Sequence, residues 1–356
     1  MTPFSRPSAS QPARPPPGNA LGTLPVRNPL SRIILSSPPA IIFLGVGRSL
    51  KPTRTEQRNP RSRRLDRKST LEIVRALNRE DARVAPAVRR ELPAIARSVD
   101  AIVKAFRSGG RLFYIGAGTS GRLAVLDAAE CPPTFGTPPK MVQAIIAGGA
   151  RALRHASEGA EDSAPNGAKD LRRAGVSRRD VVVGLSASGT TPYVLGALEF
   201  ARRRGAVTVG VTSNPRSPLA RQARIAIAPD SGPEAIAGST RLKAGTAQKM
   251  VLNLLSTASM VRFGRVYENW MIYVALTNQK LRRRGARILE EAAGASASAA
   301  AHALRQAGHN LPAALVMLKT GANAADASRL LGASGGNVRE ALEISRKLQS
   351  KARGRS

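Results

Sequence analysis

Short apolar runs alternate with longer amphipathic segments through the middle of the chain. The runs are too short for typical helices, are rich in Val and Ile, and are bounded by Gly, Ser or Pro. They cover residues 111–117, 141–147, 180–185, 206–211 and 225–228, with helical patterns between them at 122–129, 150–158, 167–174 and 193–203. Largely apolar strands that alternate with helices indicate a parallel sheet covered on both faces. We therefore predict an α/β fold with a doubly wound, five-stranded parallel sheet across about residues 100–265.

Helical patterns flank the predicted sheet on both sides. Upstream, Ser69 followed by Glu72 is typical of a helix start, and the helices after it end at Gly109 and Gly110. Downstream, the pattern predicts two long helices and then an Ala-rich tail of short helices interrupted by glycines. These predicted segments are 247–261, 268–284 and 287–348. The tail indicates a small all-α C-terminal subdomain.

The composition changes at residue 64. Residues 1–64 are rich in Pro, Ser and Arg without sustained periodicity, which is typical of a disordered or extended segment. The apolar stretch 33–46 is split by Pro38-Pro39 and has no clean cleavage site, which argues against a signal peptide. An alternative is a translation start further downstream, for instance at Val46. We expect 1–64 to be an extension or a misassigned start, 65–285 the sheet domain with its flanking helices, and 286–350 the helical subdomain.

The formal net charge of +33 invites a nucleic-acid interpretation. The basic residues are mostly Arg, spread along the whole chain, and they are not interleaved with aromatic side chains that stack on bases. We therefore expect no nucleic-acid partner. A single cysteine excludes an intramolecular disulfide framework and a multi-Cys metal site, and it fits a reducing compartment. With three histidines, a His-built metal centre is also disfavoured. No apolar run approaches the ~20 residues of a membrane-spanning helix, so no membrane partner is expected.

Two loops rich in small and hydroxyl residues follow the first and third predicted strands. Ligands of open parallel sheets bind beyond the carboxyl ends of the strands, where helix N-termini attract anions. The first loop matches G-x-G-x-x-G at Gly116, Gly118 and Gly121, but no acidic residue follows at the spacing that a dinucleotide site needs. Neither loop is a Walker A motif, and both suit a monophosphate. The predicted phosphate-binding residues are Thr119, Ser120, Ser186, Ser188 and Thr191.

Carboxylates, a cysteine and a lysine near these loops are further candidates. Glu130 lies at the end of the helix that starts from the first loop, and Glu161 lies in an acidic segment after the second strand. The alternative for both is a solvated helix end. Cys131 is either a nucleophile or, in the absence of a partner His motif, a small buried thiol. Lys243 precedes a long helix and is either an anion-binding cation or part of a capped helix start.

Several motifs, taken in order, resemble a known family. They are G-A-G-T-S-G-R-L-A-V-L-D-A-A-E-C-P-P-T-F-G at 116–136, E-G-A-E-D-S at 158–163, A-S-G at 187–189 with T-P-Y-V at 191–194, and K-A-G-T-A-Q-K at 243–249. Together they resemble bacterial N-acetylmuramic acid 6-phosphate etherases of the sugar isomerase (SIS) domain superfamily, from about Leu65 to Leu348. Ala124 and Leu242 stand where that family usually has Gly and Met, which are mild departures.

The resemblance implies an activity. Such enzymes cleave the D-lactyl ether at C3 of N-acetylmuramic acid 6-phosphate, giving N-acetylglucosamine 6-phosphate and D-lactate in cytoplasmic peptidoglycan recycling. The family's two glutamates correspond here to Glu130 and Glu161. Ring opening exposes an aldehyde that acidifies the C2 proton, lactate is then eliminated, and water adds back. This carbon–oxygen lyase reaction needs no metal and no cofactor.

The resemblance also suggests roles and an assembly. We assign Glu130 as the acid that protonates lactate and later activates water, and Glu161 as the C2 base, with the reverse assignment open. A homodimer is expected because the cleft of related SIS proteins is completed by a second subunit.

Three alternatives remain. A non-catalytic sugar-phosphate-binding regulator of the same superfamily is the nearest, although such regulators carry two SIS domains. An aldose–ketose isomerase would use one Glu and usually a His. A nucleic-acid-binding protein with an SIS sensor domain would need a helix-turn-helix before the sheet. The glutamate motifs favour the etherase, because the fold alone hosts several functions.

Overall fold

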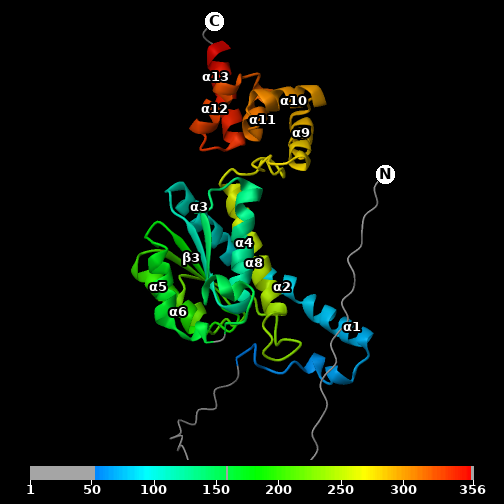
Figure 1. Cartoon of the computed structure of the whole chain (residues 1–356), viewed down its shortest axis with the longest axis vertical. Helices are drawn as coiled ribbons and strands as arrows, with labels where there is room; N and C mark the ends of the chain where they lie inside the picture. Colours follow the sequence, from blue (N-terminus) through cyan, green and yellow to red (C-terminus); the bar gives the residue numbers. More distant parts are fainter. Residues whose placement is uncertain (1–52, 158, 354–356) are drawn as a thin grey trace, which may run out of the picture. The chain divides into compact units, whose positions relative to one another are not determined.

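Five parallel strands form one sheet in the order β2-β1-β3-β4-β5 (Figure 1). The protein is seen in a computed structural model that describes residues 53–157 and 159–353. The strands are β1 (Leu112–Gly116), β2 (Val142–Ile146), β3 (Val181–Leu185), β4 (Val207–Val211) and β5 (Ile225–Ile227). Each lies inside one of the five predicted apolar runs, so the predicted doubly wound α/β sheet is confirmed.

Helices cover both faces of the sheet. One face carries α3 (Leu92–Arg107), α4 (Gly118–Phe135) and α8 (Lys243–Arg262), and the other carries α5 (Ala164–Arg173), α6 (Pro192–Arg203) and α7 (Pro218–Gln222). Alternate strand residues supply the two cores: Leu112 and Tyr114 pack on the first face, Phe113 and Ile115 on the second. This double burial explains why the central strands are almost wholly apolar instead of alternating.

The N-terminal helices begin where the sequence predicts. The side chain of Ser69 accepts a hydrogen bond from the backbone of Glu72, and the Glu72 carboxylate accepts one from the Ser69 backbone, which completes a capping box. The elements here are η1 (Pro60–Ser62), η2 (Leu65–Arg67), α1 (Thr70–Asp81) and α2 (Val84–Arg90).

Residues 53–62, which composition places in the disordered extension, are tied to the loop that follows β5. Arg54 pairs with Asp230 at 3.2 Å, and the Thr55 carbonyl accepts a 3.0 Å hydrogen bond from the Gly238 amide. We call residues 53–62 the N-terminal strap. Its composition does not predict that it is ordered, because the residues that hold it in place lie far along the chain. Residues 1–52 lie outside the described residues.

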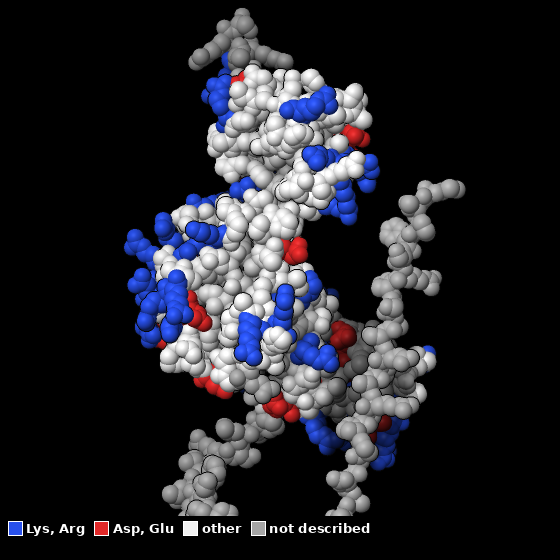
Figure 2. Space-filling view, in the orientation of Figure 1, with Lys and Arg blue, Asp and Glu red and all other residues white. Residues whose placement is uncertain are grey.

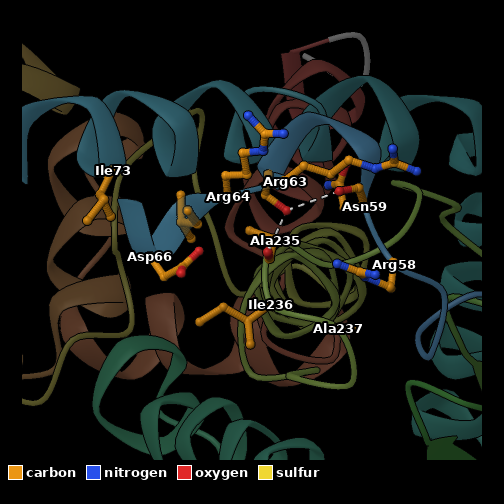
Figure 3. A pocket seen from close by; sticks show the side chains of 11 residues that line it. Arg58, Asn59, Arg63, Arg64, Asp66, Ile73, Ala235, Ile236 and Ala237 are labelled. Atoms are coloured by element: carbon orange, nitrogen blue, oxygen red, sulfur yellow. Dashed lines mark hydrogen bonds between the residues drawn. The ribbon is translucent and has the colours of Figure 1, made fainter. Parts of the chain in front are cut away.

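Asn59 and Ser62 complete the attachment of the strap. The Asn59 amide donates to the Pro233 carbonyl at 3.0 Å and to Glu80 at 2.8 Å, and the Ser62 hydroxyl donates to the Ala235 carbonyl at 2.6 Å. Figure 3 shows Asn59 and Ala235 on these facing segments, around a hollow of about 470 Å³. Asn59 is buried, and its hydrogen bond to Glu80 is shielded from water.

The C-terminal helices pack around an apolar core of their own. These helices are α9 (Gln279–Ala293), α10 (Ala297–Gln306), α11 (Leu311–Thr320), α12 (Ala324–Ala333) and α13 (Val338–Arg353). Gly294 and Gly321 end α9 and α11 in the left-handed conformation, as the predicted glycine breaks require.

Two predicted helices are wrong. In place of a helix over 150–158, the chain forms only the short 3-10 helix η3 (Gly149–Leu153), because the Arg122 guanidinium takes the Ala152, Leu153 and His155 carbonyls as acceptors. The helix predicted over 268–284 starts only at Gln279. There the Asn278 side chain caps it by accepting from the Leu281 amide at 2.9 Å.

The distribution of charged side chains and the hydropathy of the helices leave this description of the fold unchanged. Lys and Arg side chains are spread over the visible face, with fewer acidic side chains between them (Figure 2). Within residues 53–157 and 159–353, no helix combines the length and apolar character needed to cross a bilayer.

Candidate active site

A cavity of about 360 Å³ lies beyond the carboxyl ends of β1 and β3. These strands are neighbours in the sheet, but the chain continues from β1 to the outer strand β2 and from β3 to β4, on the opposite side. Their following loops therefore diverge and leave a crevice, which is where open α/β sheets bind ligands.

The cavity gathers all five predicted phosphate-binding residues. Thr119 and Ser120 reach it from the first turn of α4, and the others reach it from the loop between β3 and α6. The five residues are Thr119, Ser120, Ser186, Ser188 and Thr191, and Thr190 joins them. Their roles in binding remain a prediction, which this clustering supports.

The loop after β3 holds its hydroxyl groups in a fixed arrangement. The Ser186 hydroxyl lies 2.8 Å from that of Thr191 and accepts a 3.0 Å hydrogen bond from the Gly189 amide. The Ser188 and Thr190 hydroxyls are 2.8 Å apart. Each hydroxyl both donates and accepts, so the loop can turn donors towards a bound anion without moving its backbone.

The attraction for an anion comes from backbone dipoles. In the described part of the chain, no Lys, Arg or His lines this cavity. The N-termini of α4 and α6 border it instead, at Gly118 and Pro192, and the helix dipoles place partial positive charge there. Such a site suits a phosphate monoester held by hydroxyl and amide donors.

Only glycine fits at position 189 in the loop after β3. Its φ is +71°, and a Cβ there would lie 2.2 Å from the Ser217 hydroxyl and 2.7 Å from that of Thr212. Gly189→Ala is expected to raise KM for a phosphorylated substrate several-fold, and its clash should cost roughly 1–3 kcal/mol of stability beyond the strain of the positive φ. Steady-state kinetics and thermal unfolding measure both effects. Gly175→Ala is the matched control, because Gly175 has φ +66° with no neighbour within 4 Å; an equal effect there would refute the steric argument.

Three carboxylates line the same cavity. Glu161 and Asp162 belong to the 3-10 helix η4 (Ala160–Asp162), and Glu56 belongs to the N-terminal strap. Gly159, with φ +78°, begins η4 in the left-handed conformation, which glycine adopts without strain. The structure thus brings the predicted base Glu161 together with the predicted phosphate loops.

Glu130 does not line this cavity within its own chain. It is exposed on α4 beside a separate hollow of about 210 Å³, whose lining includes Leu126 and Lys249. Ten residues separate it from Ser120, which corresponds to about 15 Å along a helix. A single chain therefore places Glu161 and Glu130 in different hollows.

Lys243 is turned away from the cavity. Its side chain is 1% exposed, and its ammonium donates to Glu80 at 2.5 Å and to the Ser231 carbonyl at 3.1 Å. The Glu234 carboxylate accepts from the Lys243 and Ala244 amides and so caps α8. Of the two interpretations left open, the geometry matches the capped helix start.

Cys131 is buried on the inner face of α4. Burial, followed by the nearby charges of Asp127 and Glu130, raises the pKa of this thiol to about 12. A thiol that stays protonated at neutral pH is a poor nucleophile. The buried-thiol interpretation is confirmed.

The sequence reasoning missed Glu56 as a cavity residue, and it placed Asp162 in the acidic segment beside the cleft without giving it a role. One signal was present: Glu56 is the sole acidic residue among the first 64, which carry 11 Lys and Arg. This isolated acidic residue was overlooked because the Pro-rich sequence around it indicated disorder.

Comparisons with known proteins identify relatives over most of the chain. The model of the glucokinase regulatory protein N-terminal SIS domain matches residues 94–202. The N-acetylmuramic acid 6-phosphate etherase of Actinobacillus pleuropneumoniae serotype 5b (strain L20) is 51% identical over 288 residues, covering 81% of this chain and 95% of its own. The etherase of Salmonella agona (strain SL483) is 53% identical over 289 residues, covering 81% and 97%. A phosphoheptose isomerase structure from Neisseria gonorrhoeae aligns with a TM-score of 0.41 at 16% identity, covering 54% of this chain and 98% of that one.

The resemblance in the sequence motifs is thereby confirmed. The two bacterial relatives align over nearly their whole length, and the SIS-domain match falls on the sheet domain. The chain belongs to the N-acetylmuramic acid 6-phosphate etherase family.

Proposed function

We propose that this protein cleaves the D-lactyl ether of N-acetylmuramic acid 6-phosphate, releasing D-lactate and N-acetylglucosamine 6-phosphate. The observation that carries the proposal is the cavity in which Glu161 lies beside two anion-binding loops, in a chain of the etherase family. The loops hold the 6-phosphate, and the carboxylates handle protons at the sugar.

The proposed chemistry is an elimination followed by hydration, which makes the enzyme a carbon–oxygen lyase. In the open-chain aldehyde, Glu161 removes the C2 proton, because the neighbouring carbonyl group stabilises the resulting charge. A second carboxyl group protonates the ether oxygen at C3 as lactate leaves. Water then adds to C3 of the unsaturated aldehyde, and C2 regains a proton. The two carboxyl groups must start in opposite protonation states.

We propose that the second carboxyl group is Glu130 of another copy of the chain. Its position about 15 Å along α4 keeps it from its own cavity. Leu126, one turn before Glu130, is 52% exposed, so an apolar side chain borders the glutamate at the surface. A two-fold dimer through this face of α4 would bury Leu126 and bring each Glu130 towards the partner's cavity.

Mixing two inactive variants tests this arrangement. Glu130→Gln and Glu161→Gln are each expected to be nearly inactive alone. Co-expressed, they form mixed dimers in which one of the two sites has both glutamates, so activity should return to about a quarter of the wild-type value. Lactate release by the purified mixture measures it. A mixture as inactive as its components would place both glutamates in one chain's site, whereas near-full activity of Glu130→Gln alone would remove Glu130 from the reaction.

Product analysis in isotopic water tests the reaction itself. With N-acetylmuramic acid 6-phosphate in H₂¹⁸O, hydration places ¹⁸O on C3 of the sugar, and lactate keeps the original ether oxygen. Unlabelled sugar would overturn the elimination–hydration route. Binding of the sugar phosphate without lactate release would identify the protein as a non-catalytic regulator. The single cysteine fits the reducing cytoplasm that we propose for this reaction.

A further inference from the structure

Glu56 is held at the wall of the cavity by the N-terminal strap. Thr55 and Glu56 both line the cavity with Glu161, although more than a hundred residues separate them in the sequence. The strap is attached on either side of Glu56, through the Thr55 carbonyl and the Asn59 side chain. Among the described residues, the hydrogen bonds and ion pairs of the strap do not use the carboxylate of Glu56, a residue that is exposed and lines the cavity.

The loop after β5 lies against this carboxylate at Gly238. A Cβ placed on Gly238 would lie 3.2 Å from Oε2 and 3.7 Å from Oε1 of Glu56. Gly238 has φ +79°, a conformation that other residues rarely adopt. The carboxylate thus lies against bare backbone, with no side chain between it and the loop.

The proposed reaction requires a proton-transfer step to which neither Glu130 nor Glu161 is assigned. Before C2 becomes acidic the sugar ring must open, which moves a proton from the C1 hydroxyl to the ring oxygen. Among the described residues, only carboxylates line the cavity as groups able to take up a proton at neutral pH, since serine and threonine hydroxyls are far too weakly basic. They are Glu161 and Asp162 on η4, and Glu56 on the separate wall formed by the strap.

We infer that Glu56 is the catalytic residue that opens the sugar ring, an inference that rests on the proposed function. Its carboxylate accepts the proton of the C1 hydroxyl. The electron pair of that O–H bond becomes the second C1–O1 bond, while the C1–O5 bond breaks and leaves its electron pair on O5. The carboxyl group then delivers the same proton to O5. An aldehyde and a C5 hydroxyl form with no net gain or loss of protons or electrons.

Anomer exchange of the product isolates this step. N-acetylglucosamine 6-phosphate has no lactyl group, yet its α and β forms interconvert only through the same ring opening, and NMR exchange spectroscopy measures the rate. Wild-type protein is expected to accelerate the exchange, and Glu161→Gln should retain that effect. Glu56→Gln should lower it by about 10²-fold or more. Glu343→Gln, on the exposed surface of α13, is the matched control and should behave as wild type.

Each other outcome has a defined meaning. Wild-type exchange in Glu56→Gln overturns the inference, as does loss of exchange in Asp162→Asn alone. If wild-type protein releases lactate without accelerating anomer exchange, ring opening is uncatalysed and the inference fails while the proposed function stands. If it accelerates exchange but releases no lactate, the proposed function fails and the role of Glu56 is still measured. A thermal unfolding midpoint equal to wild type shows that Glu56→Gln keeps the strap in place.

Discussion

Replacing Glu161 with Gln is expected to lower kcat for lactate release by ~10²–10⁴-fold, with a much smaller change in binding of the sugar phosphate. The amide keeps the size of the side chain but cannot remove the C2 proton. The phosphate loops do not depend on this carboxylate, because their hydrogen bonds run among their own hydroxyl and amide groups. Single-turnover lactate release and equilibrium binding separate the two effects.

Deuterium exchange gives a second measurement of the same role. In D₂O, wild-type protein should place deuterium at C2 of the released sugar. With Glu161→Gln, deuterium should enter at C2 only at the slow rate of exchange without a catalytic base. A variant that exchanges C2 normally but fails to release lactate would reverse the assignment, making Glu161 the acid at C3. Near-full activity would remove Glu161 from both roles.

Replacing Lys243 with Met is expected to cost about 3–5 kcal/mol of stability, because it leaves a buried carboxylate without its cation. Glu80 is 3% exposed and depends on Lys243 and Asn59 for its hydrogen bonds. Chemical denaturation measures the loss. Lys104→Met, an exposed position on α3, is the control and should change stability little. A normal stability with a raised KM would instead assign Lys243 to phosphate binding.

A second substitution and a pH series sharpen this test. Adding Glu80→Gln to Lys243→Met removes the buried, unpaired negative charge and keeps a hydrogen-bond acceptor for Asn59. Part of the lost free energy of unfolding should therefore return. Burial alone would raise the pKa of Glu80, but hydrogen bonds from Lys243 and Asn59 and the positive charges of Lys243 and Arg61 hold this pKa below its usual value. The pair therefore stabilises the fold above the ordinary glutamate pKa, and this contribution falls away as the pH drops through the lowered value. The double variant should lose that part of the acid sensitivity.

Local patterns were enough to predict the sheet and most of its helices. Strands buried on both faces produce continuous apolar runs, and Ser69 and Gly294 mark helix ends by chemistry that acts within one turn. The prediction failed where a distant side chain supplied the hydrogen bonds. Arg122 takes the carbonyls of the segment after β2, and no pattern within that segment reveals its presence.

In the candidate site, too, residues in local patterns were predicted and residues placed by distant partners were not. The hydroxyl loops and Glu161 were found because each follows a strand or a recognisable motif, and parallel strands bring their carboxyl ends to one edge. For Lys243 the sequence left two interpretations open, because its partner Glu80 lies 163 positions away. Glu56 was missed because a segment without periodicity can still be ordered by contacts that it makes with a folded domain.

The N-terminal strap makes the order of synthesis matter. Asn59 leaves the ribosome 174 residues before Pro233, its partner in the loop after β5. At 5–20 residues per second, the strap waits roughly 10–35 s before its docking surface exists. The wall that carries Glu56 is therefore among the last parts of the cavity to form. A nascent chain that stops before the loop after β5 contains the hydroxyl loops of the cavity but lacks the docked strap.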